Sequence, residues 1–452
     1  MKIALGFGTA SQEVEVPEKN LIAVLEANEI AYDLTGEAEV RRALAAPIGS
    51  APLREIVHPG ETVAIVTSDI TRPCPTWKIL PPVLEELFTA GIRPEDVTVT
   101  FALGSHRGHT EEERKKLMGS AWGVVACRDS DPDGCVHLGD TSRGTPVDID
   151  AVVAKADRRI LFANIEYHYF AGYSGGAKSL MPGVSTRAAI QANHSRMVED
   201  AACAGRLEGN PVRQDIEEAA AICGADFIVN VVLDAHKEIV RAVAGDMTAA
   251  HREGCRFLDT MYRKTIPQRA DIVVVSQGGA PKDLNLYQVQ KALDNAKHAV
   301  RPGGVIVLVG SCREGLGEKT FEEWMLWARE PEDLIRRVRE NFKLGGHKAA
   351  AIAMVLKNAE IDLVSELEDD FVRRIFLHPY PSAQAALDHA FEKMGPDARV
   401  IVMPYGGSTL PHAENECSIY KAGAVCCSGF FHAGRSGTCP FFSCGVLSAA
   451  VR

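Results

Sequence analysis

The sequence alternates short apolar runs with amphipathic stretches along most of its length. This alternation is typical of an α/β protein built on mostly parallel sheets. The expected strands are Thr62–Thr67, Val97–Leu103, Arg159–Asn164, Phe227–Leu233, Ile272–Ser276, Val305–Val309 and Arg399–Met403. The expected helices are Pro81–Ala90, Thr110–Met118, Thr186–Ala192, Asp215–Ile222, Ala249–Tyr262, Tyr287–Ala299, Phe321–Ala328, Asp333–Phe342 and Ala383–Phe391. No internal repeat is visible, which argues against a solenoid or a propeller.

The chain has 452 residues, which is too long for one ordinary hydrophobic core and suits two domains. The segment KTIPQRA at residues 264–270 breaks a helix before a fresh strand, and it predicts the boundary. We therefore expect two α/β domains, residues 1–267 and 268–410, with an active-site cleft between them. Ligands of open parallel sheets bind at the carboxyl ends of strands, and several polar segments directly follow expected strands.

The formal net charge of −11 argues against a nucleic-acid partner, because such partners select a basic surface. An anionic substrate stays compatible with it, since a few cations can dominate the field inside a cleft. The apolar runs are too short to cross a bilayer, and the N-terminus lacks the apolar core of a signal peptide. We expect a cytoplasmic protein with no membrane partner.

Five of the twelve cysteines crowd into residues 416–445, and the other seven are scattered without a CxxC pair. This spacing disfavours a disulfide framework or a zinc ribbon in the body of the chain. The tail, residues 411–452, lacks the periodicity of the preceding chain. We expect it to lie outside the core fold, with a metal-binding appendage as the alternative.

A polar loop, Thr67–Pro73, follows the first expected strand. It holds Asp69, Thr71 and Arg72, and a guanidinium suits bidentate binding of a phosphate or a carboxylate. The loop therefore predicts an anion-binding site. A cap for the helix that starts near Pro75 is the alternative.

Two histidines, His106 and His109, follow the second expected strand. Imidazole titrates near neutral pH, so proton transfer is its natural chemistry. His109 adjoins Thr110, a plausible helix N-cap, whereas His106 is nearer to the strand end. We expect His106 to be the functional residue of the two.

The longest chemical signal is Ile165–Ser179, which follows the third expected strand. Its glycines, among them Gly175 and Gly176, offer backbone N–H groups to an anion. Lys178 is placed as a phosphate partner or, once desolvated, as a nucleophile. The segment is not a Walker A loop, because Ala177 precedes the lysine where that motif needs glycine. A run of glycine turns with a solvated lysine is the structural alternative.

His194, in the segment Ile190–Ser195, is a weak signal by itself, since a lone histidine is more often structural. Neutral imidazole is nonetheless a favoured ligand of nickel, zinc and copper. Together, His106, His168 and His194 suggest a zinc hydrolase, but the HExxH motif of such enzymes is absent. A nicotinamide dehydrogenase is disfavoured because the sequence lacks the GxGxxG fingerprint.

Taken together, these segments resemble the nickel-pincer lactate racemase family. The shared patterns are S-D-x-T-R-P, G-x-H-R, H-x-F-A-G-x-S-G-G-x-K-S and A-N-H-S. They stand here at Ser68–Pro73, Gly104–Arg107, His168–Ser179 and Ala192–Ser195. A fifth segment, Tyr287–Lys291, resembles the family's Y-Q-x-x-K. The resemblance covers roughly residues 45 to 405.

The resemblance implies an isomerase that racemises or epimerises 2-hydroxyacids with a nickel-pincer nucleotide. This cofactor is a pyridinium-3-thioamide-5-thiocarboxylic acid mononucleotide. Its thioamide is made to a lysine, which matches Lys178, and its nickel takes a histidine ligand, which matches His194. The acid/base histidines match His106 and His168. Further cofactor contacts are expected from Asp69, Thr71, Arg72, Gly175 and Gly176, and substrate contacts from Arg72, Tyr287, Gln288 and Lys291. Cofactor-biosynthesis proteins are the implied transient partners.

The implied step suits the chemistry of a 2-hydroxycarboxylate. Its α-hydrogen is weakly acidic, so it leaves more easily as hydride while one imidazole takes the hydroxyl proton. A second imidazole serves the opposite face. Lactate or another short 2-hydroxyacid is the favoured substrate, while malate, an aromatic lactate and a sugar acid such as gluconate are the alternative substrates. Ala177 stands where lactate-specific members are expected to carry a basic residue, which weakens the inference to lactate. A non-catalytic nickel or cofactor carrier, which would not need His106 and His168, is the alternative from another class.

Overall fold

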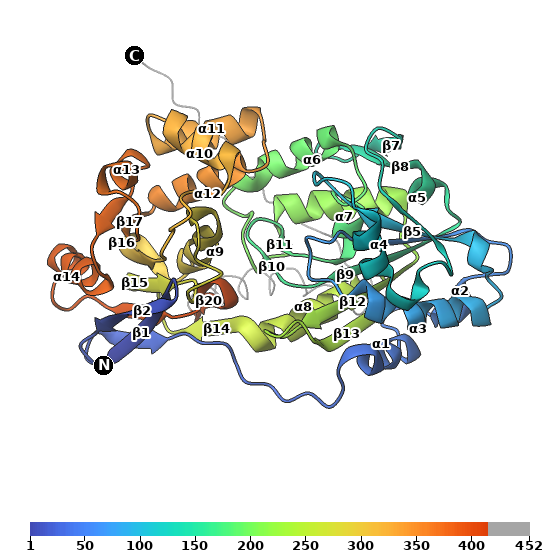
Figure 1. Cartoon of the computed structure of the whole chain (residues 1–452), viewed down its shortest axis with the longest axis horizontal. Helices are drawn as coiled ribbons and strands as arrows, with labels where there is room; N and C mark the ends of the chain where they lie inside the picture. The colour runs from blue at the N-terminus through green and yellow to red at the C-terminus, as the bar shows by residue number, and fades with distance from the viewer. Residues whose placement is uncertain (415–452) are drawn as a thin grey trace, which may run out of the picture. The chain divides into compact units, whose positions relative to one another are not determined.

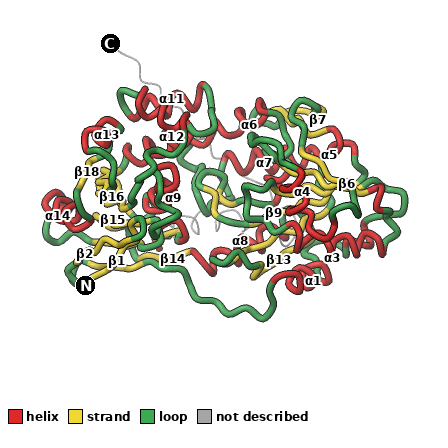
Figure 2. Tube along the Cα trace, in the orientation of Figure 1, coloured by secondary structure: helices red, strands yellow, loops and turns green. Residues whose placement is uncertain are grey.

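Two six-stranded, mainly parallel sheets organise the protein in the computed structural model, which describes residues 1–414 (Figure 1). This architecture confirms the predicted α/β class. All seven predicted strands are present, and their carboxyl ends agree with the prediction to within one residue. The nine predicted helices are present too, and Figure 2 shows helices and strands in both parts of the fold.

The first sheet has the strand order β13-β12-β9-β4-β5-β6, and only its edge strand β13 is antiparallel to its neighbour. Its strands are β4 (Val63–Ser68), β5 (Val97–Ala102), β6 (Ala126–Asp129), β9 (Arg158–Asn164), β12 (Phe227–Leu233) and β13 (Ile239–Gly245). Both faces are apolar because helices cover both. On β4, Val63 and Ile65 share a core with α1 (Gly36–Ala45) and α3 (Thr76–Thr89). Ala64 and Val66 pack into the core that includes α5 (Ala151–Lys155) and α7 (Pro211–Cys223).

The second sheet has the order β18-β17-β16-β15-β19-β3, and all its strands are parallel. Its strands are β3 (Leu21–Val24), β15 (Ala270–Ser276), β16 (Val300–Val309), β17 (Ala359–Val364), β18 (His378–Tyr380) and β19 (Val400–Met403). The hairpin of β1 (Lys2–Phe7) and β2 (Ala10–Glu15) shares a core with α14 (Ala383–Met394) on one face. The helices α9 (Leu286–Ala296) and α12 (Gly346–Leu356) pack on the other face.

The N-terminal segment of the chain therefore belongs to the second sheet, because β3 pairs with β19. The segment between Leu25 and α1 then crosses to the first sheet (Figure 1). Residues 1–413 form one compact unit, so the boundaries at residues 267 and 410 stay predictions. Residues 411–413 pair with β14 (Arg263–Ile266) as part of β20 (Leu410–Ala413). The remainder of the predicted cysteine-rich tail lies outside the described residues.

The remaining described elements connect or cover the two sheets. They are α2 (Leu53–Ile56), α4 (Glu111–Met118), β7 (Cys135–Asp140), β8 (Pro146–Asp150), β10 (Tyr167–His168), β11 (Gly172–Tyr173), α6 (Arg187–His194), α8 (Ala249–Tyr262), α10 (Lys319–Trp327), α11 (Pro331–Glu340) and α13 (Asp369–Arg374). Within residues 1–414, every helix is too short or too polar to span a bilayer.

Candidate active site

The polar segments singled out in the sequence follow three adjacent strands of the first sheet. β4 lies between β9 and β5, and the three strands run parallel. Their carboxyl ends therefore meet at one edge, at Ser68, Ala102 and Asn164. This edge carries the loop that holds Asp69, the loop that holds His106 and the segment that leads to Lys178. The structure thus confirms the expectation that these segments follow strands.

A carboxylate–imidazole pair stands at this edge. His106 Nδ1 lies 2.5 Å from Asp69 Oδ2, and the Thr71 hydroxyl donates to Asp69 Oδ1 at 2.7 Å. Burial opposes ionisation of Asp69, but the hydrogen bonds from His106 and Thr71 outweigh it and lower its pKa. Because Nδ1–H donates to a carboxylate, the neutral His106 ring keeps its lone pair on Nε2. Both Asp69 oxygens are occupied within the protein, which indicates that this residue positions His106.

His109 has a structural role that is distinct from that of His106. Its Nδ1 lies 2.6 Å from Asp129 Oδ1, and its Nε2 accepts the backbone N–H of Ile70 at 3.0 Å. This buried ring therefore fixes the loop that contains Asp69. The helix cap predicted nearby is formed by Thr110, which builds a capping box with Glu113.

A short hairpin presents His168. Its two-residue strands β10 and β11 pair His168 with Gly172, and the hydroxyls of Tyr167 and Tyr173 both donate to Asp259 Oδ1, at 2.8 and 2.7 Å. The backbone N–H of Ala171 donates to His168 Nδ1 at 3.2 Å. The neutral ring therefore carries its proton on Nε2. Burial, and then the positive charge of Lys178, lowers the His168 pKa well below its ordinary value.

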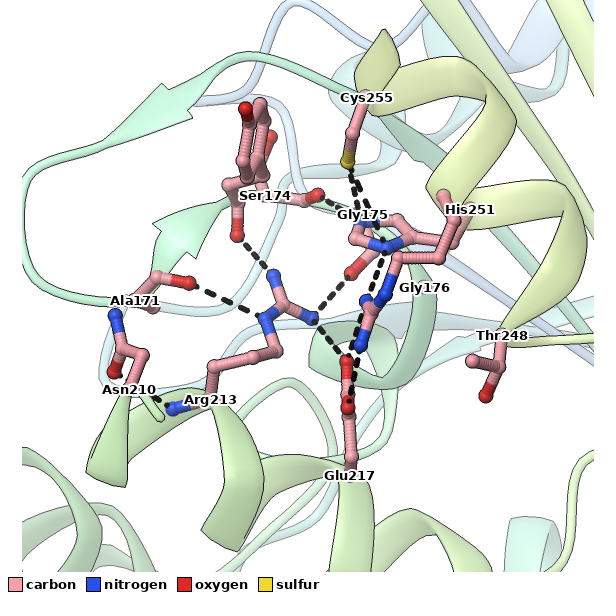
Figure 3. Close-up of polar contacts among 12 residues, drawn as sticks. Ala171, Ser174, Gly175, Gly176, Asn210, Arg213, Glu217, Thr248, His251 and Cys255 are labelled. Atoms are coloured by element: carbon pink, nitrogen blue, oxygen red, sulfur yellow. Dashed lines mark hydrogen bonds and ion pairs between the residues drawn. The ribbon is translucent and has the colours of Figure 1, made fainter. Parts of the chain in front are cut away.

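A fully buried arginine on α7 holds the glycine-rich loop that follows the hairpin (Figure 3). The Arg213 guanidinium donates to the carbonyl oxygens of Ala171 at 3.2 Å, Gly175 at 3.4 Å and Tyr173. Burial lowers the pKa of Arg213 to about 10, against the opposing effect of Glu217. Arg213 was not predicted as a site residue, because the periodicity of a helix does not distinguish a buried arginine from a solvated one.

The loop glycines are needed for close packing. A Cβ on Gly176 would lie 2.9 Å from the ring of His251, and one on Gly175 would lie 2.7 Å from Asn230 Oδ1. The Gly176 N–H already donates to Asn230 Oδ1 at 2.7 Å. His251 Nε2 donates to the carbonyl of Ser174 at 2.8 Å (Figure 3). The phosphate-binding role of Gly175 and Gly176 stays a prediction, and the Gly176 donor is satisfied within the protein.

Lys178 lies in the helical turn that follows this loop. Its ammonium is 5.9 Å from the centroid of the Phe170 ring, and it makes no ion pair with any residue between 1 and 414. Burial lowers the Lys178 pKa well below its usual value, and the charges of Arg213 and Arg72 act in the same direction. The lowered pKa makes the unprotonated, nucleophilic form of the amine more accessible than in a solvated lysine.

His194 ends α6 and is oriented through its neighbour Asn193. The Asn193 amide nitrogen donates to Asp215 Oδ2 at 2.7 Å, which directs its oxygen to His194 Nδ1 at 2.9 Å. His194 thus donates through Nδ1 and leaves the Nε2 lone pair free, as a metal ligand requires. Burial, followed by the charge of Lys178, lowers the His194 pKa well below its ordinary value.

Three of the four predicted substrate residues, Tyr287, Gln288 and Lys291, lie on α9, which follows the second-sheet strand β15, whereas Arg72 lies in the loop after β4. Tyr287 packs edge-on against Phe321, with ring centroids 5.7 Å apart, and Lys348 Nζ lies 4.0 Å from the centre of the Tyr287 ring. The Gln288 N–H caps the helix on Asn285 Oδ1. Surrounding protein lowers the Lys291 pKa, and the positive charge of Arg72 contributes to this effect. Arg72 also acts on Tyr287, which places α9 within electrostatic reach of the β4 loop.

The two sheets meet the site through aromatic contacts as well. The Tyr169 ring lies 6.1 Å from that of His347 on α12, and His194 lies 5.3 Å from Phe342. Arg72 and Lys291 bring positive charge to this region, and the carboxylates of Glu166 and Asp69 oppose it. The side chains of Arg72 and Lys291 can attract an anionic ligand locally although the chain has a net negative charge.

Comparisons with known proteins agree with this arrangement. Residues 7–205 match the family model of the lactate racemase N-terminal domain, and residues 265–410 match that of the lactate racemase C-terminal domain. A lactate racemase from Thermoanaerobacterium thermosaccharolyticum is 30% identical over 423 residues, which cover 90% of this chain and 98% of that protein. A lactate racemase from Lactiplantibacillus plantarum is 30% identical over 419 residues, which cover 89% and 98%.

Solved structures show the same relationship. The lactate racemase apoprotein from T. thermosaccharolyticum superposes with a TM-score of 0.82 at 30% identity, covering 91% of this chain and 100% of that chain. A protein from Thermotoga maritima shares the fold, with a TM-score of 0.58 at 17% identity over 84% of this chain and 100% of that chain.

The fold, the clustered imidazoles and these matches define the class of protein, a two-domain α/β isomerase of the racemase and epimerase type. More particularly, the chain belongs to the lactate racemase family. The family and the fold class predicted from the sequence motifs are thereby confirmed.

Proposed function

We propose that this protein inverts C2 of a 2-hydroxycarboxylate, lactate or another short 2-hydroxyacid, with a nickel-pincer nucleotide attached to Lys178. The observation that carries the proposal is a pair of available nitrogens: the half-buried Lys178 amine, which makes no ion pair among residues 1–414, and His194 Nε2, which stays free because Nδ1 faces Asn193. Family membership supports the reaction class, and the guanidinium of Arg72 and the ammonium of Lys291 support an anionic substrate.

The residues fit the proposed cofactor. The Lys178 amine, whose pKa is lowered, would condense with a thiocarboxylic acid of the cofactor, keeping the sulfur and releasing water, and would thus hold the cofactor through a thioamide. His194 Nε2 is suited to ligate nickel, with Asn193 fixing its tautomer. When bound, such a cofactor supplies a carbon that accepts and returns hydride.

The two proposed acid/base histidines carry their proton on different ring nitrogens. His106 has Nε2 unprotonated, because Nδ1–H faces Asp69, and it is ready to accept the hydroxyl proton of the substrate. His168 carries Nε2–H, because Nδ1 accepts from Ala171, and in this tautomer it can donate a hydrogen bond to a substrate oxygen. For the opposite enantiomer His168 serves as the base, which requires its proton to move to Nδ1 and the 3.2 Å bond from Ala171 to break, so that Nε2 can take the hydroxyl proton.

The substrate carboxylate is assigned to Arg72 and Lys291, with Tyr287 and Gln288 orienting it from α9. The Arg72 guanidinium makes no ion pair with other residues in the described part of the chain, which leaves its planar fork available for a carboxylate. Asp69 and Thr71 are assigned to the positioning of His106, in place of a direct cofactor contact.

The test is made on protein co-produced with cofactor-making enzymes. Intact mass, peptide mapping and nickel content are measured on one sample, with Lys178→Ala as the matched control. We expect a mass increment on Lys178, close to one nickel per chain and racemisation of a 2-hydroxyacid. Both enantiomers of lactate, malate, phenyl-lactate and gluconate with its C2 epimer are supplied to identify the substrate.

Two outcomes would contradict the proposal. A folded chain without adduct or nickel, beside a positive control that acquires both, would show that the cofactor assignment is wrong. A fully loaded chain that exchanges the α-hydrogen of none of these acids would favour a cofactor carrier.

A further inference from the structure

We propose a second metal site, for a divalent cation of the Zn²⁺ class, formed by Glu360, Asp362, His378 and His389 in the second sheet. The site is independent of the proposed function. Glu360, Asp362 and His389 bring one potential ligand atom each to within 4.8 Å of the others. His378 adjoins the two carboxylates outside this set of three, and it becomes a fourth ligand if its ring turns toward the ion.

The fold brings these four residues together from three elements. Glu360 and Asp362 alternate along β17, so their side chains share one face of that strand. His378 begins the edge strand β18, where it lies opposite Asp362 in the register. α14 packs against β17 and β18 and contributes His389.

The spacing of the ligand atoms suits a metal ion. His378 Nδ1 lies 3.3 Å from Glu360 Oε1 and 3.5 Å from Asp362 Oδ1, and His389 Nδ1 lies 3.2 Å from Asp362 Oδ2. Ligands held at Zn–N and Zn–O distances near 2.1 Å in a tetrahedron are about 3.4 Å apart. The separations of His378 from the two carboxylates and of His389 from Asp362 are close to this value. The two imidazoles face different oxygens of Asp362, so the side chains have to turn for all four ligands to reach one ion.

A buried oxygen without a hydrogen-bond partner points to the missing cation. The Asp362 side chain is fully buried, and its Oδ1 lacks a hydrogen bond within the described residues. Lys393, which pairs with the other oxygen of Glu360, is the single ammonium or guanidinium paired with these two carboxylates among residues 1–414. A divalent cation would satisfy Oδ1 and balance the remaining charge.

The ligand types select the class of ion. Imidazole and carboxylate donors together suit Zn²⁺ and similar transition-metal ions, whereas Ca²⁺ and Mg²⁺ prefer oxygen ligands alone. Binding requires each imidazole to turn an unprotonated nitrogen toward the ion. The structural alternative is a network in which His378 and His389 donate to the carboxylates and no ion binds.

Calorimetric titration with Zn²⁺ alone tests the site on the full-length, cofactor-free chain after treatment with a chelator. The background variant carries His194→Ala and serine at the five tail cysteines, Cys417, Cys426, Cys427, Cys439 and Cys444, so that other donors do not contribute. We expect one equivalent of Zn²⁺ to bind. His378→Ala, His389→Ala and the isosteric Asp362→Asn should each raise the Kd at least tenfold. Circular dichroism confirms that each variant is folded.

Two further variants make the result decisive. His137 forms a comparable surface pair with Asp148, at 2.8 Å, so His137→Ala is the matched control and should leave Zn²⁺ binding unchanged. Lys393→Met removes the competing ammonium and should lower the Kd several-fold, which a purely structural network would not do. The proposal would be overturned if the background variant bound no Zn²⁺. It would also be overturned if neither His378→Ala nor His389→Ala changed the Kd for Zn²⁺ in folded protein.

Discussion

At the scale of single residues, the site depends on side chains that fix the tautomer or position of others. Asp69 directs the His106 proton to Nδ1, Asn193 does the same for His194, and Ala171 sets the opposite tautomer of His168. Arg213 holds the backbone of the loop that leads to Lys178. Two predictions belong to this scale.

The first concerns the pairing of Asp69 with His106. Asp69→Asn keeps the size of the side chain but removes the negative charge and permits the wrong tautomer of His106. We expect kcat to fall by roughly 10²- to 10⁴-fold, the range attributed to a positioned acid/base group. Cofactor loading at Lys178, measured by intact mass, should be unchanged. A variant with kcat within twofold of the parent would show that His106 does not need this partner.

The second concerns Arg213. Arg213→Lys concentrates its N–H donors on one nitrogen, which cannot reach all three carbonyl oxygens that Nε, Nη1 and Nη2 of the guanidinium contact separately. A buried acceptor without a donor costs about 1–3 kcal/mol. We expect a loss of about 2–4 kcal/mol in the free energy of unfolding, measured in urea, once partial relaxation is allowed for. Arg252→Lys, on a partly exposed ion pair with Glu217, is the matched control and should cost less than about 1 kcal/mol. Equal losses in the two variants would contradict this account.

At the scale of elements, prediction succeeded where the periodicity of the sequence was clear. The carboxyl ends of the predicted strands were located to within one residue, because a polar residue, a glycine or a proline ends each apolar run. α3 begins at Thr76, five residues before its predicted start, and accommodates Pro81 and Pro82 in its interior. α12 was missed, since its sequence GHKAAAIAMVL is apolar on nearly all sides and gives no amphipathic pattern. The edge strand β18 was missed because it is only three residues long.

The amino ends of three second-sheet strands are joined by one carboxylate, which gives an element-scale prediction. Asp271 in β15 accepts from Arg301 Nε at 2.5 Å and from the backbone and side chain of Arg399, at 2.8 and 3.1 Å. Burial opposes ionisation, but these donors lower the pKa of Asp271 to about 2. Because the folded pKa is depressed, the stabilisation is present above the ordinary carboxyl pKa near 4 and is lost as the pH falls toward 2.

Asp271→Asn should therefore cost about 1–2 kcal/mol at neutral pH, after a discount for the partly exposed arginines. The difference in unfolding free energy between parent and variant should be constant from pH 5 to 7 and should shrink below about pH 4. Urea unfolding across this range provides the measurement. Asp397→Asn, on an exposed pair with Lys19, should have little effect at any pH. A difference that persists unchanged to pH 2.5 would mean that the Asp271 pairs are not the cause.

At the scale of the whole molecule, the N-terminal segment packs with the second sheet, whose other strands come from the C-terminal half of the chain. The N-terminal hairpin packs in the core of the second sheet, and β3 extends that sheet beside β19. The side chains of Ile3, Leu5, Val14 and Val16 are buried there. Burial of each such side chain contributes about 1.5–3 kcal/mol relative to exposure.

Removal of residues 1–24 should therefore destabilise the second sheet selectively. Hydrogen exchange followed by mass spectrometry should show lost protection in β19 and β15, because their apolar face and one strand edge become exposed. Protection in β4 and β5 should be retained. Unchanged exchange in β19 would contradict the structural role of this segment, and equal loss in both sheets would show that the two do not unfold separately.

The sequence by itself determined the α/β class, the strand ends and the family, together with His106, His168, Lys178 and His194 as candidate residues. These are local properties, since periodicity and motif spacing depend on residues that are close together in the sequence. Only the tertiary structure decided that Asp69 faces His106, that Arg213 is buried beneath the glycine-rich loop and that β3 joins the second sheet. It alone also brought His378 and His389 to Asp362. Such contacts join residues far apart in sequence, and whether a polar side chain is solvated or buried depends on the chain packed around it.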